Sequence, residues 1–170
     1  MARLSTQLAE IGVSAVLTSR APDHGVWVPL YRMWERPSFP VLQISLNSAR
    51  GVRRHLELGR RLAPLRGRGV MIKASGGAVH NLRRLDWSGH ATPPAPWADA
   101  FVEALEVAMA RGDEQALCEP WSLPGGRESH PTLEHYLPLL VAYGAALPGP
   151  LAPVHRGWSH GSLALHAYTG

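Results

Sequence analysis

The chain has 170 residues, of which 45% are hydrophobic and 18% are charged, a balance typical of a folded globular protein rather than a disordered one. Its formal net charge is +4, but all 17 basic residues except Lys73 are arginine and no aromatic residues alternate with them, so the sequence does not favour nucleic-acid binding. The single cysteine, Cys118, excludes an intrachain disulfide and a thiolate-rich metal site. No apolar run of about 18 residues and no continuous apolar leader is present, so we expect a cytoplasmic protein with no membrane partner.

Short apolar segments predict β-strands in the first half of the chain. They are Val13–Thr18, Pro40–Leu46 and Val70–Ala74, each bounded by polar, glycine or proline residues that favour turns. A short amphipathic helix ends at Glu10, before the first of these strands. A loop and then a short helix over Gly25–Trp34 are expected between the first two strands.

The rest of the chain predicts three longer helices and a final strand. Apolar residues at helical spacing predict helices over Ala49–Leu65, Trp97–Arg111 and Leu133–Leu147, and alternation predicts a strand over Ser162–Tyr168. Because strands and helices alternate, we expect an α/β fold, with a mostly parallel sheet flanked by helices. The prediction is a single domain over residues 1–170.

The chain has nine histidines, and three of them are expected at turns where a site could form. His24 follows the first predicted strand, His80 follows the Ser75-Gly76-Gly77 turn after the third, and His135 follows Glu134 near a helix start. Ligands of open α/β sheets bind at such strand ends. Histidine is the usual ligand of iron or zinc and the usual proton carrier near neutral pH. Spacing alone leaves two alternatives open, a histidine-lined site or separate structural histidines.

Several segments occur in the same order as in one enzyme family: Asp23-His24-Gly25 followed by Trp27 and Pro29, then PVLQISLNS, ASGGAVHNLRRLDW, PWADAF and HPTLEHYLPLLVAYGAA. In these segments the chain resembles the DOPA 4,5-dioxygenase-like group of class III extradiol ring-cleavage dioxygenases. The resemblance implies an aromatic ring-opening enzyme that acts on a small aromatic diol, an extradiol catechol of the DOPA type. It also implies non-haem Fe(II), with zinc as the alternative, and O2 as co-substrate.

The resemblance also implies roles for individual residues. His80 corresponds to the acid/base histidine beside the metal, which is a metal ligand in some zinc-bound relatives, and His24 to a second pocket histidine that contacts the substrate hydroxyls. The TLEHY segment carries the C-terminal metal ligand. Iron chemistry with two histidines and one carboxylate favours Glu134 as this ligand, whereas the zinc-type description favours His135.

The chain departs from the family at its front. Family members carry two further metal-binding histidines, in a His-Gly-Ser-Pro-type motif and a Ser-x-His-Trp motif, and this chain has neither. We therefore expect the C-terminal part of the family fold, an encoded loss of the N-terminal portion, and weakened metal binding. Exposed strand edges would favour a homo-oligomer or a partner fragment covering the truncated sheet. The alternative is a non-catalytic remnant or metal-binding interaction module of the same fold. An arginine-rich nucleic-acid binder is kept only because of the pI of 9.8.

Overall fold

The computed structural model describes residues 2–16, 18–36, 38–149 and 151–170. The helices in chain order are α1 (Ala2–Glu10), α2 (His24–Met33), α3 (Val52–Leu62), α4 (Pro96–Arg111), α5 (Glu114–Cys118), α6 (Gly126–Ser129) and α7 (Leu137–Ala146). Short 3-10 turns are η1 (Ser48–Arg50), η2 (Ala63–Arg68), η3 (Leu82–Arg84) and η4 (Pro120–Ser122). The strands are β1 (Ala152–His155), β2 (Trp158–Ser159), β3 (Leu163–Ala164) and β4 (Ala167–Thr169). In the described part of the chain, no helix has the length and apolar character needed to cross a membrane.

Helices α3 and α7 cross closely. Gly59 of α3 and Gly144 of α7 lie at the crossing point, where the backbones of the two helices touch. A Cβ atom at Gly59 would overlap the carbonyl oxygen of Val141, and one at Gly144 would overlap that of Leu56. Glycine at both positions therefore allows the two helices to pack backbone against backbone.

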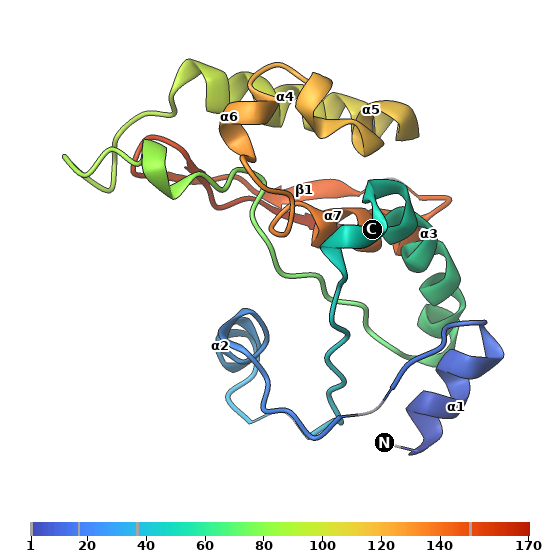
Figure 1. Cartoon of the computed structure of the whole chain (residues 1–170). Helices are drawn as coiled ribbons and strands as arrows, with labels where there is room; N and C mark the ends of the chain where they lie inside the picture. The colour runs from blue at the N-terminus through green and yellow to red at the C-terminus, as the bar shows by residue number, and fades with distance from the viewer. Residues whose placement is uncertain (1, 17, 37, 150) are drawn as a thin grey trace.

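The main hydrophobic core lies between α7 and the helices α4 and α5. Helix α4 buries Phe101, Leu105 and Met109 along one face, and Gly112 ends it in the left-handed conformation with φ of 70°. Tyr136 is fully buried, and its hydroxyl donates a hydrogen bond of 2.8 Å to the carbonyl of Leu117 in α5. Figure 1 shows α4, α5 and α6 grouped above α7 and the small sheets.

Two predicted helices differ from the structure at their ends. The expected helix over Ala49–Leu65 is divided into η1, α3 and η2, because Gly51 between the first two adopts φ of 76° and interrupts the helical backbone. The expected helix over Leu133–Leu147 begins only at Leu137, with Pro138 in the first turn, where the missing N–H of proline costs no hydrogen bond. The helix predicted over Trp97–Arg111 is confirmed as α4.

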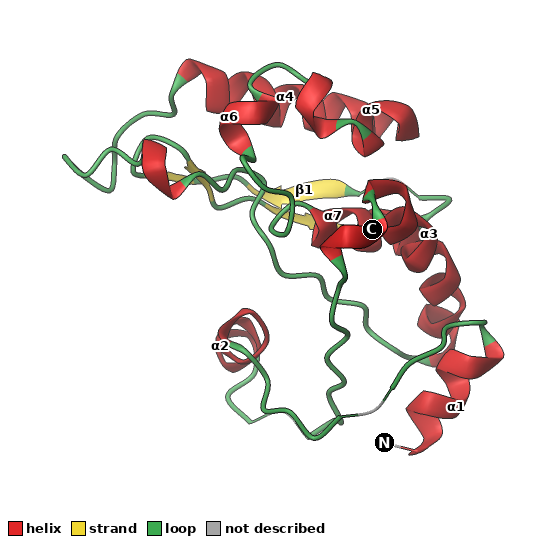
Figure 2. Ribbon diagram, in the orientation of Figure 1, coloured by secondary structure: helices red, strands yellow, loops and turns green. Residues whose placement is uncertain are grey.

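The strands that pair in the structure all lie near the C-terminus. β1 pairs with β4 and β2 with β3, both antiparallel, so the predicted strand Ser162–Tyr168 is divided between β3 and β4. Figure 2 shows these short strands in yellow near the middle of the molecule.

The mostly parallel sheet expected from the sequence is not formed among the described residues. The segments predicted as strands, Val13–Thr18, Pro40–Leu46 and Val70–Ala74, are extended where they are described, but no backbone ladder joins them. In Figures 1 and 2 the second and third of these segments are drawn as loops below α7 and not as strands. A β-strand is held by backbone hydrogen bonds to a neighbouring strand, and the described residues of these segments make no such bonds with one another.

The third of these segments alternates in burial along its length. Val70 and Ile72 are partly buried against the cluster around Leu62 and Leu65, whereas Met71 between them is exposed. One face of this segment is therefore covered by α3 and η2. This segment was predicted from its run of apolar residues and not from alternation, and the predicted pairing is not formed among the described residues.

Candidate functional site

The loop that carries His80 and the loop that carries His135 are held side by side by backbone hydrogen bonds. The amide of Gly77 donates to the carbonyl of His135 over 3.0 Å, and the amide of His80 donates to the carbonyl of Ser129 over 3.0 Å. A Cβ atom at Gly76 would overlap the carbonyl oxygen of His135. Glycine in the turn therefore permits the contact between the two loops.

This contact places the imidazole rings of His80 and His135 in a parallel stack. Their centroids are 3.4 Å apart and their planes differ by 8°. The pKa of His135 is lowered, first by partial burial and then by the charge of His80, while Glu134 opposes the shift. His135 therefore remains neutral near pH 7, and the stack avoids two adjacent positive charges.

The carboxylate of Glu134 lies beside this stack at the exposed surface. One of its oxygens, Oε1, accepts a hydrogen bond of 2.7 Å from the Thr132 hydroxyl and lies 3.9 Å from Nδ1 of His135. The hydrogen bond from Thr132, followed by one from the backbone amide of Glu134 itself, lowers the pKa of this carboxyl group. Glu134 is therefore an anion at neutral pH and can accept hydrogen bonds or bind a cation.

His24 approaches the same place from α2. Its charge contributes to the lowered pKa of His135, and a Cβ atom at its neighbour Gly25 would lie 3.6 Å from the Ser75 hydroxyl. The start of α2 is fixed by Asp23, whose amide donates to Gln43 Oε1 over 3.2 Å and whose carboxylate accepts from Gln43 Nε2 over 2.7 Å. The structure thus brings together all four residues singled out from the sequence: His24, His80, Glu134 and His135.

His130 is buried next to the site, and it was not singled out from the sequence. Its side chain is fully buried between the rings of Phe101 and Tyr136, with centroids 5.4 Å and 5.3 Å away. Its Nε2 lies 2.8 Å from the carbonyl of Ala78, which can only accept, so Nε2 carries the proton. Nδ1 has no partner among the described residues. His130 therefore connects the loop of His80 to the loop of His135 through this hydrogen bond. In the sequence, only its position five residues before His135 indicated that it lies near the site.

Acid is expected to destabilise the protein through His130. Burial is the main cause that lowers the pKa of His130 from 6.5 to about 4. The unfolded chain therefore binds a proton between these pH values that the folded chain does not, so this contribution to stability is complete above pH 6.5 and is lost as the pH falls toward 4. We expect a loss of about 3 kcal/mol, measured by urea unfolding across this range. The His130→Gln variant should lose this pH dependence and the exposed His90→Gln control should keep it. Equal slopes for both variants would contradict the assignment.

Comparisons with known proteins place this chain in a family. The family model described as the catalytic LigB subunit of aromatic ring-opening dioxygenase matches residues 2–160. The chain belongs to the LigB family. This confirms the resemblance to class III extradiol dioxygenases, whose LigB members generally depend on a non-haem metal and O2.

Individual relatives agree with this LigB assignment. The chain is 40% identical over 146 residues to the 4,5-DOPA dioxygenase extradiol of Escherichia coli (strain K12), a match that covers 84% of this chain and 54% of the relative. It is 37% identical to the protein of the same name from Beta vulgaris, over 98% of this chain and 63% of the relative. A crystal structure of an uncharacterized protein from Escherichia coli K12 superimposes with a TM-score of 0.83 at 37% identity, covering 97% of this chain and 69% of the other.

The matches cover a larger share of this chain than of its relatives. Nearly all of this chain has a counterpart in the Beta vulgaris protein and the solved structure, but it spans only 54% and 63% of the two curated relatives and 69% of the solved one. Because the match leaves part of each relative uncovered, these relatives contain polypeptide in addition to the part shared with this chain.

The residues gathered at this candidate site do not by themselves fit a metal. Metal-bound imidazoles direct in-plane lone pairs at one ion about 2.1 Å away. The rings of His80 and His135 are parallel and 3.4 Å apart, so one ion cannot lie in both ring planes. Among the described residues, no group of three or more histidine, cysteine, aspartate or glutamate side chains is arranged to hold a metal ion. Glu134, His80 and His135 therefore do not form a complete metal site in this arrangement.

Proposed function

We propose that this chain is the acid/base part of an aromatic ring-opening dioxygenase that acts on a small aromatic diol, an extradiol catechol of the DOPA type. The stacked pair of His80 and His135, with His24 beside it, is the observation that carries the proposal. Membership of the LigB family and the names of the relatives support the reaction class. The proposed domain is the whole of residues 1–170.

The chemistry of the pair suits proton transfer to and from a catechol. A diol hydroxyl must lose a proton before the ring can be opened, and the imidazole of His80 is a group that can accept it. Because His135 is stacked against this ring and has a lowered pKa, it stays neutral and does not compete for the proton. His24, on the exposed start of α2, can donate a hydrogen bond to the second hydroxyl.

Fe(II) is the proposed metal, zinc is the alternative, and O2 is the proposed co-substrate. Glu134 or His135 would be the C-terminal ligand, with His80 as a further candidate in the zinc case. Since parallel stacking prevents His80 and His135 from sharing one ion, the remaining ligands would come from outside the described residues. We therefore propose that the chain alone is impaired in metal binding and turnover.

Oxygen uptake tests this function directly. The chain is loaded with Fe(II) without oxygen, mixed with DOPA or protocatechuate, and followed with an oxygen electrode while the ring-opened product is monitored by absorbance. We expect one O2 consumed per ring opened, at a rate well below that of the Escherichia coli relative measured beside it. The second candidate function, a non-catalytic interaction module, is favoured by the incomplete metal geometry. No uptake by the chain, either alone or with added polypeptide, would support the module and overturn the dioxygenase.

A further inference from the structure

A pocket of about 430 Å³ lies between the start of α3 and the segment that joins α5 to α7. Small-molecule sites in proteins commonly have volumes of about 300 to 1,000 Å³. Trp121 of η4 forms part of its wall, and we call it the Trp121 pocket. The residues that line it do not include His24, His80, Glu134 or His135, so it is not part of the arrangement described above.

The walls of the Trp121 pocket are fixed by close contacts. A Cβ atom at Gly126 would overlap the carbonyl oxygen of Pro120, so η4 and α6 pack directly against each other. The indole Nε1 of Trp121 donates a hydrogen bond of 2.7 Å to the carbonyl of His130, which holds the ring against the chain that follows α6. The pocket is therefore formed before a ligand enters, and this lowers the entropic cost of binding.

The apolar part of the Trp121 pocket suits an aromatic ring. Trp121 is 41% exposed, and half-buried Val52 and Leu133 line the same pocket. Aromatic rings pack on an indole in stacked or edge-to-face geometry. The guanidinium of Arg127 lies 5.3 Å from the centroid of this indole, so a ring on Trp121 would have a positive charge beside it.

Two opposite charges line the Trp121 pocket, and neither is paired. Arg127 and Glu119 are both exposed, and neither has an ion-pair partner within the described part of the chain. A guanidinium binds a carboxylate through two parallel hydrogen bonds, and a carboxylate accepts hydrogen bonds from an ammonium group. A ligand that carries both a carboxylate and an ammonium group would therefore satisfy both side chains.

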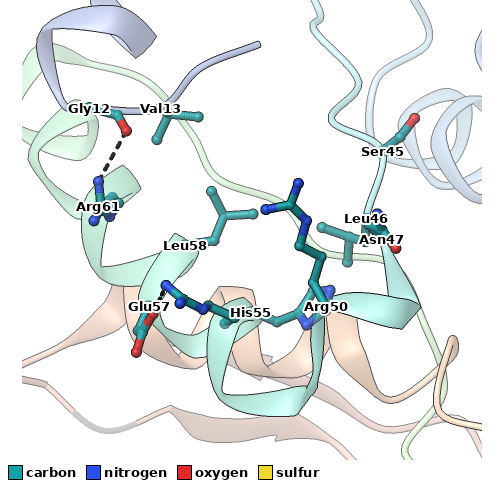
Figure 3. Close-up of a pocket in the computed structure, with 11 residues that line it drawn as sticks. Gly12, Val13, Ser45, Leu46, Asn47, Arg50, His55, Glu57, Leu58 and Arg61 are labelled. Carbon is teal, nitrogen blue, oxygen red and sulfur yellow. Dashed lines mark hydrogen bonds and ion pairs between the residues drawn. The ribbon is translucent and has the colours of Figure 1, made fainter.

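The pocket beside α3, shown in Figure 3, does not offer this combination. Its volume is about 270 Å³, and Arg61 donates a hydrogen bond of 3.0 Å to the carbonyl of Gly12. Glu57 is the one carboxylate among the described residues that line it, and Arg54 pairs with it over 3.3 Å. An ammonium group would find no free carboxylate there.

We propose that the Trp121 pocket binds a free aromatic amino acid as a zwitterion, with its ring on Trp121, its carboxylate on Arg127 and its ammonium group on Glu119. An aromatic acid without the ammonium group would leave Glu119 unpaired, and an aromatic amine would leave Arg127 unpaired. Both should therefore bind more weakly than the amino acid. The inference does not rest on the proposed function, because the ring that binds here needs no hydroxyl groups.

The thiol of Cys118 gives a direct measure of occupancy, because Cys118 is the only cysteine of the chain and lines the Trp121 pocket. Burial is the main cause that raises the pKa of this thiol, so its alkylation by iodoacetamide is slow and is followed over hours at about pH 8. The ligands compared are L-phenylalanine, phenylpropionate and phenylethylamine, which share the ring and differ in their charged groups. We expect L-phenylalanine to slow alkylation, and each of the other two to need at least about tenfold higher concentration for the same effect. If either simpler compound protects Cys118 as well as L-phenylalanine does, or if none of the three protects it, the proposal is overturned.

Two variants assign the charged groups. Arg127→Gln should weaken protection by L-phenylalanine and phenylpropionate but not by phenylethylamine, whereas Glu119→Gln should weaken protection by L-phenylalanine and phenylethylamine but not by phenylpropionate. Arg111→Gln and Glu103→Gln, at exposed positions of α4 outside the pocket, are the matched controls and should change nothing. Because the charge of Glu119 also raises the pKa of Cys118, each variant is compared with itself without ligand.

Circular dichroism establishes that each variant is folded. Unchanged protection by L-phenylalanine in both Arg127→Gln and Glu119→Gln would overturn the proposal. L-phenylalanine has no diol, so these results do not depend on ring opening, and oxygen uptake tests the proposed function separately.

Discussion

Replacing Gly144 with alanine is expected to destabilise the folded chain by about 3 kcal/mol or more. The added Cβ atom would overlap the carbonyl oxygen of Leu56 and lie 3.0 Å from the amide nitrogen of Arg60 and 3.2 Å from Cα of Gly59. All three are backbone atoms of α3, so no flexible side chain can turn aside. The helices would have to separate, and the buried side chains between them would lose contact with one another. Urea unfolding followed by circular dichroism measures this loss.

A matched glycine provides the control. A Cβ atom at Gly67, in η2, would meet nothing within 4 Å, and its backbone does not have the positive φ that favours glycine. Gly67→Ala should therefore raise the free energy of unfolding by about 0.5 kcal/mol, since alanine restricts the unfolded chain. Gly59→Ala, on the other side of the crossing, should behave like Gly144→Ala. If Gly144→Ala and Gly67→Ala had equal stability, α3 and α7 would not touch as closely as described.

The helices could be predicted from the sequence because their signals are local. Helix α4 has apolar residues at helical spacing, Pro96 in its first turn and Gly112 after its end, and it was predicted to within one residue. The crossing of α3 and α7 could not be predicted, because two glycines 85 positions apart along the chain carry no pattern that pairs them. The parallel sheet expected from the sequence is not formed among the described residues, and the reason is similar. The apolar run at residues 70–74 predicts an extended segment, but it cannot supply the neighbouring strand.

The candidate site was predicted partly by position and partly by resemblance. The family resemblance selected His24, His80 and His135 among nine histidines, and these residues lie together although the strands expected before His24 and His80 are not formed among the described residues. His130 was missed because complete burial and a bond to Ala78 depend on tertiary packing. The parallel stacking of His80 and His135 was also unforeseen, since it depends on Gly76 bringing two loops into contact.

Substituting His80 with alanine is expected to have the largest effect on activity. If His80 moves the catechol proton, then kcat should fall by about a hundredfold to ten-thousandfold in the enzyme as it turns over, whether as the chain alone or with added polypeptide. His155→Ala is the matched control, because His155 is exposed on β1 and lies outside the site. Retention of full activity by His80→Ala would contradict the acid/base assignment.

Metal content separates the role of His80 from that of its neighbours. An acid/base residue can be removed without loss of the ion, so His80→Ala should keep the same ratio of iron to protein as the unaltered enzyme. Removing a ligand should lower metal affinity steeply, so the two open alternatives give different results. Glu134→Gln loses iron if the carboxylate is the ligand, and His135→Ala loses iron if the imidazole is. Since His80 and His135 are stacked in parallel at 3.4 Å, they cannot both bind one ion without separating. Iron loss in both histidine variants would therefore show that the stack opens when metal binds, and that His80 is a ligand as well as a base.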